Sequence, residues 1–353
     1  MIGPVAERVE QITPEWLTQA LQSAGHDLVV STVHHEQIGT GQIGSTYRLV
    51  LAYEGRLGPS TLVAKLASAD ESRRALVSPG YAAEVGFYLH LAPQLHVDTP
   101  RCWYGAIAEG NSEFTLILDD MTPAIPGVQA DGCTVAQAAA AIDNLLGLHV
   151  PLWNDPALED LSFLLRSSPG TAAMLGDVMK SATDGFVERY ESDLGKDDIE
   201  TLRGAAQVIA EWQMAGLTPF SAIHGDYRLD NLLFAPTGDR VVVVDWQTVA
   251  VGPPMRDVAY FLGTSLDSIQ RKAHETQLVS RYHDALVARA VPDYGADQCW
   301  YDYRLGQLQG PMITVLGCMY ATAERSERSD AMFLVMARRS CAAIRDQGSL
   351  DLF

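Results

Sequence analysis

The spacing of apolar and polar residues changes about one third of the way along the chain. Short runs that are β-branched or alternate between apolar and polar residues lie at Val29–Gln37, Ser45–Tyr53 and Thr61–Leu66, with glycines between them. Such alternation indicates strands with one buried face, so we predict an antiparallel meander here. Two more strands are predicted near Cys102–Ala108 and Phe114–Leu118.

Helical patterns surround these strands. Thr13, Pro14 and Glu15 supply a capping hydroxyl, a proline for the first helical position and an acid for the first turn, so a helix is predicted up to about Ala24. A second helix is predicted over Tyr81–Leu91. Beyond the last strand the chain is mostly helical, with predicted helices at Val135–His149, Ala172–Glu191 and Ile199–Ala215 and after Ser268, and an island of strands and turns over Phe220–Val251.

This distribution predicts an α+β fold with two lobes. Residues 1–118 form an N-terminal lobe built on an antiparallel β-sheet, and residues 119–353 form a mostly helical C-terminal lobe. The connection between the lobes is expected near Asp119–Gly127.

A glycine-rich segment lies between two of the predicted strands. Gly39, Gly41 and Gly44 form the pattern GxGxxG, which is a weak signal by itself. A dinucleotide-binding turn must open a helix, whereas Ser45–Tyr53 alternates like a strand, and no Lys-Ser/Thr ending supports a Walker A loop. A glycine loop between antiparallel strands is how kinases cover the phosphates of ATP. An ordinary hairpin is the alternative.

Lys65 ends an apolar run and therefore needs an anionic partner if it is half-buried. Glu84 follows 19 residues later on the predicted helix Tyr81–Leu91, a separation that lets a strand, a loop and a helix bring the two together. The pair would place the lysine ammonium on the α- and β-phosphates of a nucleotide. The alternative is a surface lysine and a solvated glutamate.

The segment from His224 to Asp245 is the most informative part of the chain. His224, Gly225 and Asp226 precede Asn231, and after a predicted hairpin the chain reaches Asp245. Phosphoryl transfer requires a carboxylate that accepts the hydroxyl proton and oxygen ligands for Mg²⁺. Asp226 supplies the carboxylate, and Asn231 and Asp245 supply the oxygens.

This segment resembles the HGDxxxxN catalytic loop of the aminoglycoside phosphotransferase-like kinases, and Asp245 resembles the metal-binding aspartate of their next strand. The DWQ form of residues 245–247, the motifs at 252–254 and 257–262, and the opening at 12–17 are similar to the ecdysteroid kinase-like branch. The resemblance covers about residues 12–325. It implies a two-lobed, protein kinase-like fold.

The resemblance also implies roles for single residues. Asp226 would be the catalytic base, Asn231 and Asp245 the Mg²⁺ ligands, and Lys65 the phosphate-binding lysine held by Glu84. The remaining implied nucleotide-binding residues are the glycines of the loop (Gly39, Gly41, Gly44) and the segment whose backbone would hydrogen-bond the adenine (Asp119, Asp120, Met121).

Two further residues have implied positions in the catalytic loop. Arg228 lies where protein kinases carry a lysine that contacts the γ-phosphate, although a structural salt bridge is an open alternative. Asp257 resembles the aspartate that holds the catalytic loop through backbone N–H groups. The side chains do not decide between ATP and GTP.

Composition narrows the class of protein. The 353 residues are 47% hydrophobic and carry a formal net charge of −19, so we expect a sizeable core and no nucleic-acid partner, since an acidic surface repels phosphate backbones.

No run approaches the ~18 apolar residues of a membrane span, and the N-terminus lacks the regions of a signal peptide. We therefore predict no membrane association and a cytoplasmic location. The five cysteines are widely spaced and are predicted to be buried free thiols.

The acceptor is expected to be a small-molecule alcohol, because nothing after Asp245 resembles the activation segment of a protein kinase. The acidic surplus after Leu118 suits a polycationic aminoglycoside, or it serves solubility. Residues Cys299–Tyr303 and Pro311–Tyr320 either line a pocket for a less polar alcohol or form core helices. The DWQ resemblance favours acceptors other than aminoglycosides. The oligomeric state does not follow from the sequence.

The sequence leaves two alternative functions, which belong to different classes of protein. The leading prediction is a small-molecule kinase that uses ATP as co-substrate and Mg²⁺ as cofactor. The alternative is a catalytically degenerate kinase fold that serves as a nucleotide-binding or scaffold protein. The joint presence of Lys65, Glu84, Asp226, Asn231 and Asp245 favours the enzyme.

Overall fold

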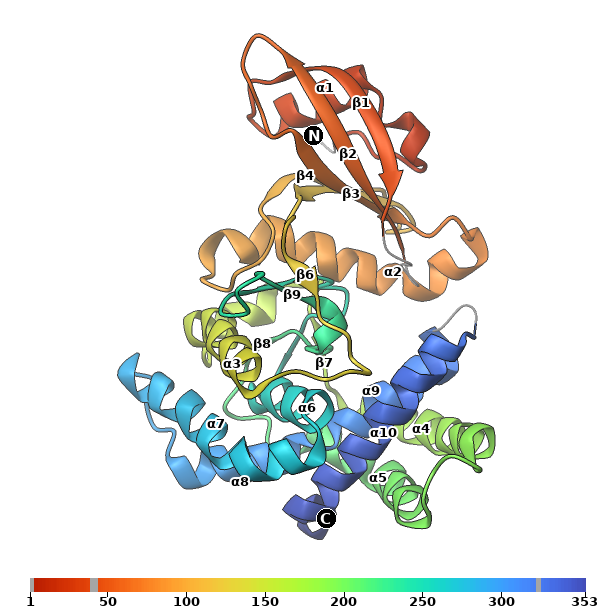
Figure 1. Ribbon diagram of the computed structural model, residues 1–353, viewed down its shortest axis with the longest axis vertical. Helices are drawn as coiled ribbons and strands as arrows, with labels where there is room; N and C mark the ends of the chain where they lie inside the picture. The colour runs from red at the N-terminus through yellow and green to blue at the C-terminus, as the bar shows by residue number, and fades with distance from the viewer. Residues whose placement is uncertain (1–2, 39–43, 322–324) are drawn as a thin grey trace. The chain divides into compact units, whose positions relative to one another are not determined.

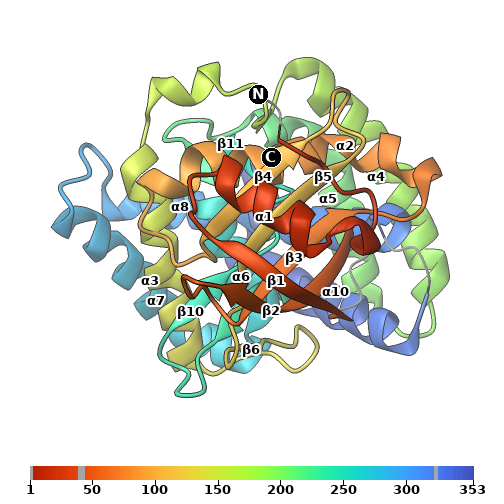
Figure 2. The same cartoon turned by 90° about the horizontal axis from the view of Figure 1, so that it is seen from above.

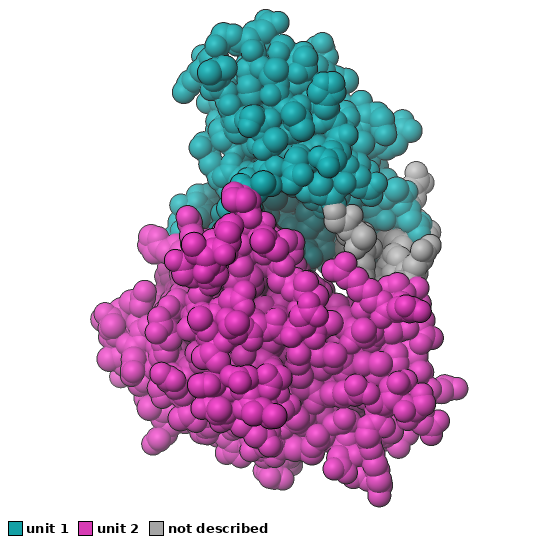
Figure 3. Space-filling view, viewed as in Figure 1, with its two compact units in different colours: residues 1–95, 99–122, 245–249 teal, residues 96–98, 123–244, 250–353 magenta. Residues whose placement is uncertain are grey.

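The computed structural model describes residues 3–38, 44–321 and 325–353. The chain forms two compact units, and neither is continuous in sequence (Figure 3). Unit 1 contains residues 1–95, 99–122 and 245–249, and unit 2 contains residues 96–98, 123–244 and 250–353. The sequence predicts a division after Leu118, whereas these units divide after Thr122 and include the segment Asp245–Val249 in unit 1.

Unit 1 is built on one antiparallel sheet of five strands in the order β1-β2-β3-β5-β4. Each of the five predicted strands is present, with ends within about one residue of the prediction, because alternation with a buried face is a strong local signal. The strands are β1 (Val29–Gln37), β2 (Gly44–Glu54), β3 (Thr61–Ala67), β4 (Cys102–Ile107) and β5 (Phe114–Asp119).

The two faces of this sheet differ in what they carry. Helix α1 (Pro14–Ser23), whose first turn is capped by Thr13 Oγ1, lies across one face (Figure 2). Leu49 and Leu62 are buried beneath it. Because successive residues of a strand point to opposite faces, Lys65 lies on the other face.

The helix after β3 is longer than predicted. We expected Tyr81–Leu91, but α2 spans Glu71–Gly86 and a π-helical turn covers Phe87–Leu91. The first part of α2 was not predicted because Pro79, which lies inside this helix, is a residue that normally ends one. Contacts of α2 with β4 and β5 outweigh this local preference.

Unit 2 is mostly helical, as predicted, and its helices α4 and α5 lie side by side (Figure 1). Its helices are α3 (Val135–His149), α4 (Pro169–Tyr190), α5 (Lys196–Met214), α6 (Met255–Ser265), α7 (Ser268–Ala288), α8 (Ala296–Gly306), α9 (Gln309–Leu316) and α10 (Glu327–Gln347). Two small sheets have the orders β10-β9-β6 and β7-β11-β8. Their strands are β6 (Ile125–Pro126), β7 (Leu165–Arg166), β8 (Ser221–Ile223), β9 (Leu232–Phe234), β10 (Val241–Val243) and β11 (Ala250–Gly252).

The core of unit 2 joins α4, α5, α6, α9 and α10 around buried residues such as Trp212, Tyr260 and Met336. The sheet of unit 1 and the helices of unit 2 confirm the predicted α+β fold. All five cysteines are free thiols, and three of them are buried as predicted, whereas Cys102 and Cys133 are half-buried. Within the described parts of the chain, no helix is both long enough and apolar enough to cross a membrane.

Candidate active site

The turn that precedes Asp226 is held by a buried carboxylate of α6. Asp257 Oδ2 accepts a hydrogen bond from the backbone N–H of His224 at 2.7 Å, and Oδ1 accepts one from Gly225 at 2.9 Å. Gly225 has a φ of +81°, a backbone conformation that residues with a side chain rarely adopt. His149 Nε2 lies 3.3 Å from Asp257 Oδ2. These contacts fix the backbone just before Asp226.

Replacing Asp257 by asparagine should therefore destabilise unit 2. An asparagine of the same shape presents an NH₂ group to one of the two backbone N–H donors, which loses its partner at a cost of about 1–3 kcal/mol. Urea unfolding measures this loss. Asp267→Asn is the matched control, because Asp267 caps α7 from an exposed position and asparagine caps equally well. Equal stabilities of the two variants would contradict the assigned role of Asp257.

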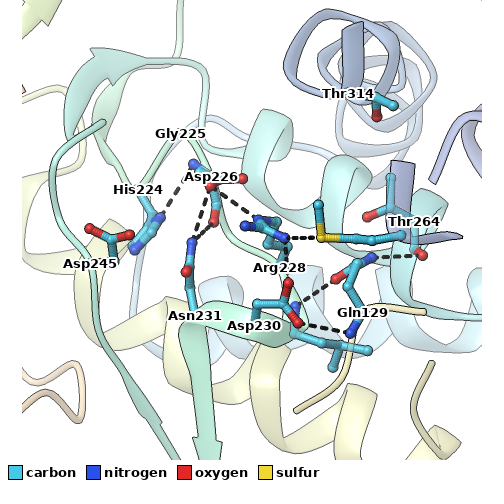
Figure 4. Close-up of polar contacts among 12 residues, drawn as sticks. Gln129, His224, Gly225, Asp226, Arg228, Asp230, Asn231, Asp245, Thr264 and Thr314 are labelled. Carbon is cyan, nitrogen blue, oxygen red and sulfur yellow. Dashed lines mark hydrogen bonds and ion pairs between the residues drawn. The ribbon is translucent and has the colours of Figure 1, made fainter. Parts of the chain in front are cut away.

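Three donors hold the carboxylate of Asp226. Its Oδ1 accepts from the Tyr260 hydroxyl at 2.8 Å. Its Oδ2 accepts from Asn231 Nδ2 and Arg228 Nε, both at 3.2 Å (Figure 4). A carboxylate has about four acceptor positions, so one is left for a further donor. The side chain of Asp226 is 20% exposed, which keeps that position accessible.

Arg228 lies between two carboxylates. Its Nη1 donates to Asp230 Oδ2 at 2.7 Å and to Met332 Sδ at 3.1 Å, while its Nε reaches Asp226. Burial lowers the pKa of the Arg228 guanidinium, but Asp226, Tyr260 and Asp230 together raise it above its ordinary value. Arg228 thus forms the structural salt bridges that the sequence left open as an alternative. A contact of Arg228 with the γ-phosphate stays a prediction.

His224 connects the catalytic loop to the end of β10. The backbone N–H of Asp226 donates to His224 Nδ1 at 3.3 Å, so the proton of the ring belongs on Nε2, which lies 3.1 Å from the carbonyl oxygen of Val244. The Val244 N–H in turn donates to the carbonyl oxygen of Asn231. These two bonds hold the end of β10 against the loop of residues 224–231 within unit 2.

Several residues of this network were not predicted from the sequence, among them Tyr260 and Gln129. Gln129 donates its N–H to Asp230 Oδ1, accepts the Leu229 N–H on its Oε1 and donates its Nε2 to the carbonyl oxygen of Thr264 (Figure 4). No motif spacing points to Gln129. Tyr260 lies in the segment 257–262 that carried the resemblance, but nothing there indicated a contact with Asp226.

A second cluster of charges lies in unit 1. Lys65 Nζ donates to Glu84 Oε1 at 2.7 Å and to Asp245 Oδ1 at 2.8 Å. The structure thus brings Lys65 and Glu84 together. Burial alone lowers the pKa of Lys65, but the two carboxylates raise it above its ordinary value. Burial raises the pKa of Glu84, and Lys65 opposes this shift.

The segment after Asp245 attaches this aspartate to unit 1. The ring of Trp246 stacks on Phe87 with centroids 3.6 Å apart, and its Nε1 donates to Thr99 Oγ1 at 3.0 Å. The backbone N–H of Trp246 donates to Glu84 Oε1 at 3.2 Å. Asp245 has a φ of +65°, in the left-handed region that aspartate tolerates better than most residues. The backbone therefore turns sharply at the predicted metal ligand.

The other predicted nucleotide-binding residues also belong to unit 1. Gly39 and Gly41 lie outside the described residues. A Cβ on Gly44 would lie 2.7 Å from the carbonyl oxygen of Leu66, so this position requires glycine. Asp119 Oδ1 accepts from Trp103 Nε1, and the side chain of Asp120 is also bound within the unit. Met121 follows them and is half-buried.

The two segments proposed as an acceptor pocket are largely core. In α8, the Tyr303 hydroxyl donates to Glu275 of α7 at 2.8 Å, and Asp302 accepts from Tyr294 at 2.9 Å. In α9 and the turn after it, Met312, Val315 and Cys318 are buried in the core of unit 2. The core alternative therefore describes most of these two segments, although Tyr301 and Tyr320 are exposed.

Comparison with known proteins gives a family match over most of the chain. The model of the phosphotransferase enzyme family matches residues 34–298. Acyl-CoA dehydrogenase family member 11 of Homo sapiens is 42% identical over 62 residues, which cover 16% of this chain and 8% of that protein. Member 10 of Mus musculus is 51% identical over 39 residues, 11% of this chain and 4% of that protein. The matched stretch thus spans less than a tenth of these relatives.

Solved structures show a similar fold at low sequence identity. Aminoglycoside 2′-phosphotransferase-IIIa in its GDP complex has a TM-score of 0.55 and 13% identity, covering 93% of this chain and 98% of that one. Choline kinase from Cryptosporidium parvum has a TM-score of 0.55 and 10% identity, with coverage of 91% and 92%. Ethanolamine kinase from Plasmodium vivax has a TM-score of 0.51 and 11% identity, with coverage of 89% and 84%.

Proposed function

Because the chain belongs to the phosphotransferase enzyme family, we propose that it transfers the γ-phosphate of ATP to a hydroxyl group of a small molecule. The observation that carries this proposal is the state of Asp226, whose carboxylate is oriented by three donors and still partly exposed. Such a carboxylate is suited to accept a proton from an incoming hydroxyl. The proposal is also consistent with the named substrates of the similar kinases, which are choline and ethanolamine.

The proposed reaction assigns one task to each group. The acceptor oxygen forms a bond to the γ-phosphorus, the bond from that phosphorus to the β-phosphate oxygen breaks, and the hydroxyl proton passes to Asp226. Tyr260 and Arg228 keep the carboxylate oriented through their hydrogen bonds. Lys65, held by Glu84, binds the phosphates of the nucleotide. The glycine loop and the backbone of residues 119–121 bind the rest of the nucleotide.

Asn231 and Asp245 are the residues that we propose to hold Mg²⁺. Asn231 uses its amide nitrogen for Asp226, which directs its amide oxygen away from that carboxylate. No group of three or more His, Cys, Asp or Glu side chains in the described ranges is arranged to hold a metal. Mg²⁺ suits a pair of oxygen ligands, since it keeps several waters and is completed by substrate phosphates. Bound there, it would neutralise charge on the phosphates.

The metal assignment predicts that turnover stops when EDTA removes the metal and returns with Mg²⁺ or Mn²⁺. Asp245→Asn should weaken the response to Mg²⁺ and lower the rate, because it removes a charged oxygen ligand. Asp239→Asn, an exposed acid in the preceding turn, is the control. An Asp245→Asn enzyme with the rate and metal dependence of the wild type would contradict the assignment.

The proposed function is tested by incubating the protein with Mg·ATP and a panel of hydroxyl compounds, followed by mass spectrometry for phosphorylated products. A product that increases with enzyme concentration supports the proposal. If the protein binds Mg·ATP and phosphorylates no member of a broad panel, the degenerate kinase fold becomes the better description. The cytoplasmic location stays a prediction.

A further inference from the structure

Arg48 shares a sheet face with Lys65. In the register of the sheet, Thr46 of β2 lies opposite Lys65 of β3, and Arg48 lies opposite Val63. Residues directly opposite in an antiparallel pair, and residues two apart on one strand, point to the same face. The Arg48 side chain is therefore on the face opposite α1, about 7 Å along the strands from the row of Lys65.

This face continues to β5 and to the segment that follows it. Val63 pairs on its other side with Leu118, so Arg48, Val63 and Leu118 form one row across three strands. The chain leaves this row through residues 119–122, which we call the hinge segment. The proposed function assigns the backbone of this segment to the nucleobase.

A closed set of hydrogen bonds ties Arg48 to the hinge segment. Arg48 Nε donates to Asp120 Oδ2 at 2.7 Å, and Arg48 Nη2 donates to Thr122 Oγ1 at 3.0 Å. The Thr122 hydroxyl and N–H both donate to Asp120 Oδ1, at 2.8 and 3.1 Å. Two residues of the hinge segment are thus bound to each other and to β2.

The burial of the Asp120 side chain distinguishes its ion pair with Arg48 from an ordinary surface ion pair, although Thr122 is exposed. The Asp120 side chain is 5% exposed, whereas the Arg48 side chain is 29% exposed. Burial raises the pKa of Asp120, but the hydrogen bonds from Arg48 and Thr122 outweigh it and lower the pKa below its usual value. A contact of Arg48 with the exposed Glu36 is longer, at 3.6 Å, and such contacts contribute little. The shorter contact of Arg48 is therefore the one with Asp120, and the contact with Glu36 is secondary.

We propose that Arg48 and Thr122 are positioning residues for the nucleobase, because they hold Asp120 and thereby fix the backbone of the hinge segment before a nucleotide arrives. This inference rests on the proposed function and extends it to residues outside the recognised motifs. Binding to a backbone that is already ordered avoids the entropy cost of ordering it during association. Without Arg48, that cost falls on nucleotide binding.

The test compares a nucleotide with a probe that lacks the base. Isothermal titration of the full chain gives the dissociation constants of Mg·ATP, Mg·GTP and Mg·tripolyphosphate. For Arg48→Met we expect nucleotide affinity to fall by roughly 5- to 30-fold, the cost of ordering about one backbone residue, with tripolyphosphate affinity unchanged. Arg48→Lys should recover part of the loss, since an ammonium still reaches Asp120. Glu36→Gln is the matched control and should bind like the wild type.

The outcomes separate this inference from the proposed function. Arg48→Met with wild-type nucleotide affinity overturns the inference alone, and so does equal weakening of nucleotide and tripolyphosphate, which indicates a phosphate contact or a general loss of structure. If Arg48→Met fails to fold, Thr122→Val removes one hydroxyl and keeps the ion pair, and it should weaken the nucleotide selectively. A wild-type chain that binds neither nucleotide overturns both the inference and the proposed function.

Discussion

Replacement of Asp226 by asparagine should abolish most of the phosphoryl transfer while the protein still folds and binds Mg·ATP. General-base assistance contributes typically ~10²–10⁴-fold in rate, so kcat should fall by about this factor with little change in the KM of the acceptor. An asparagine can still accept from Tyr260, which preserves part of the local hydrogen bonding. Initial rates of ADP release with a productive acceptor, together with titration of Mg·ATP, measure the two quantities.

Asp230→Asn is the matched control for this experiment. Asp230 binds the same arginine and also accepts the N–H of Gln129, but it is assigned no proton transfer. Its replacement should affect stability more than kcat. If Asp226→Asn instead loses melting temperature and nucleotide affinity along with activity, Asp226 braces the loop and is not the base. Turnover at the wild-type rate would make the catalytic assignment wrong.

Lys65→Met should have the largest effect on unit 1. It leaves the buried carboxylate of Glu84 without its cation, and Glu84 Oε2 already has no hydrogen-bond partner among the described residues. Removing one partner of a buried ion pair typically costs about 3–5 kcal/mol, so the free energy of unfolding should fall by that order. Nucleotide affinity should fall as well, because the proposed phosphate ligand is gone. Urea unfolding and calorimetric titration report the two effects.

The double variant Lys65→Met/Glu84→Gln separates these two effects. A neutral amide at position 84 removes the uncompensated charge, so we expect stability to recover in part while nucleotide affinity stays low. Lys196→Met, at an exposed lysine paired with Glu200 on α5, is the control and should change stability by less than about 0.5 kcal/mol. Recovery of nucleotide affinity in the double variant would exclude Lys65 as a phosphate ligand.

The strands and most helices were determined by local pattern. The alternating run of β2 and the capped start of α1 each indicate their secondary structure within about ten residues. A strand or helix that buries one face must place its apolar residues at a fixed spacing. Helix α2 was one exception, since Pro79 and its neighbour Gly80 signal a break that the contacts of α2 with β4 and β5 override. Local propensity yields where tertiary packing contributes more free energy.

The catalytic loop was predictable for the same reason. Asp226 and Asn231 lie within six residues, so their spacing indicated a carboxylate with an oxygen ligand beside it, and the structure places the two side chains in contact. The roles of these residues remain predictions. The pairing of Lys65 with Glu84 was also anticipated, because a strand and the helix after it commonly pack together.

What only the tertiary structure decided is which distant residues hold these groups. Tyr260 reaches Asp226 across 34 positions of the chain, Arg48 reaches Asp120 across 72, and Trp246 reaches Glu84 across 162. A single sequence records residue types in order, and hydrogen bonds depend on separations of about 3 Å in space that no local period encodes. The sequence therefore determined the elements and the reactive groups, whereas packing between remote segments decided how those groups are oriented.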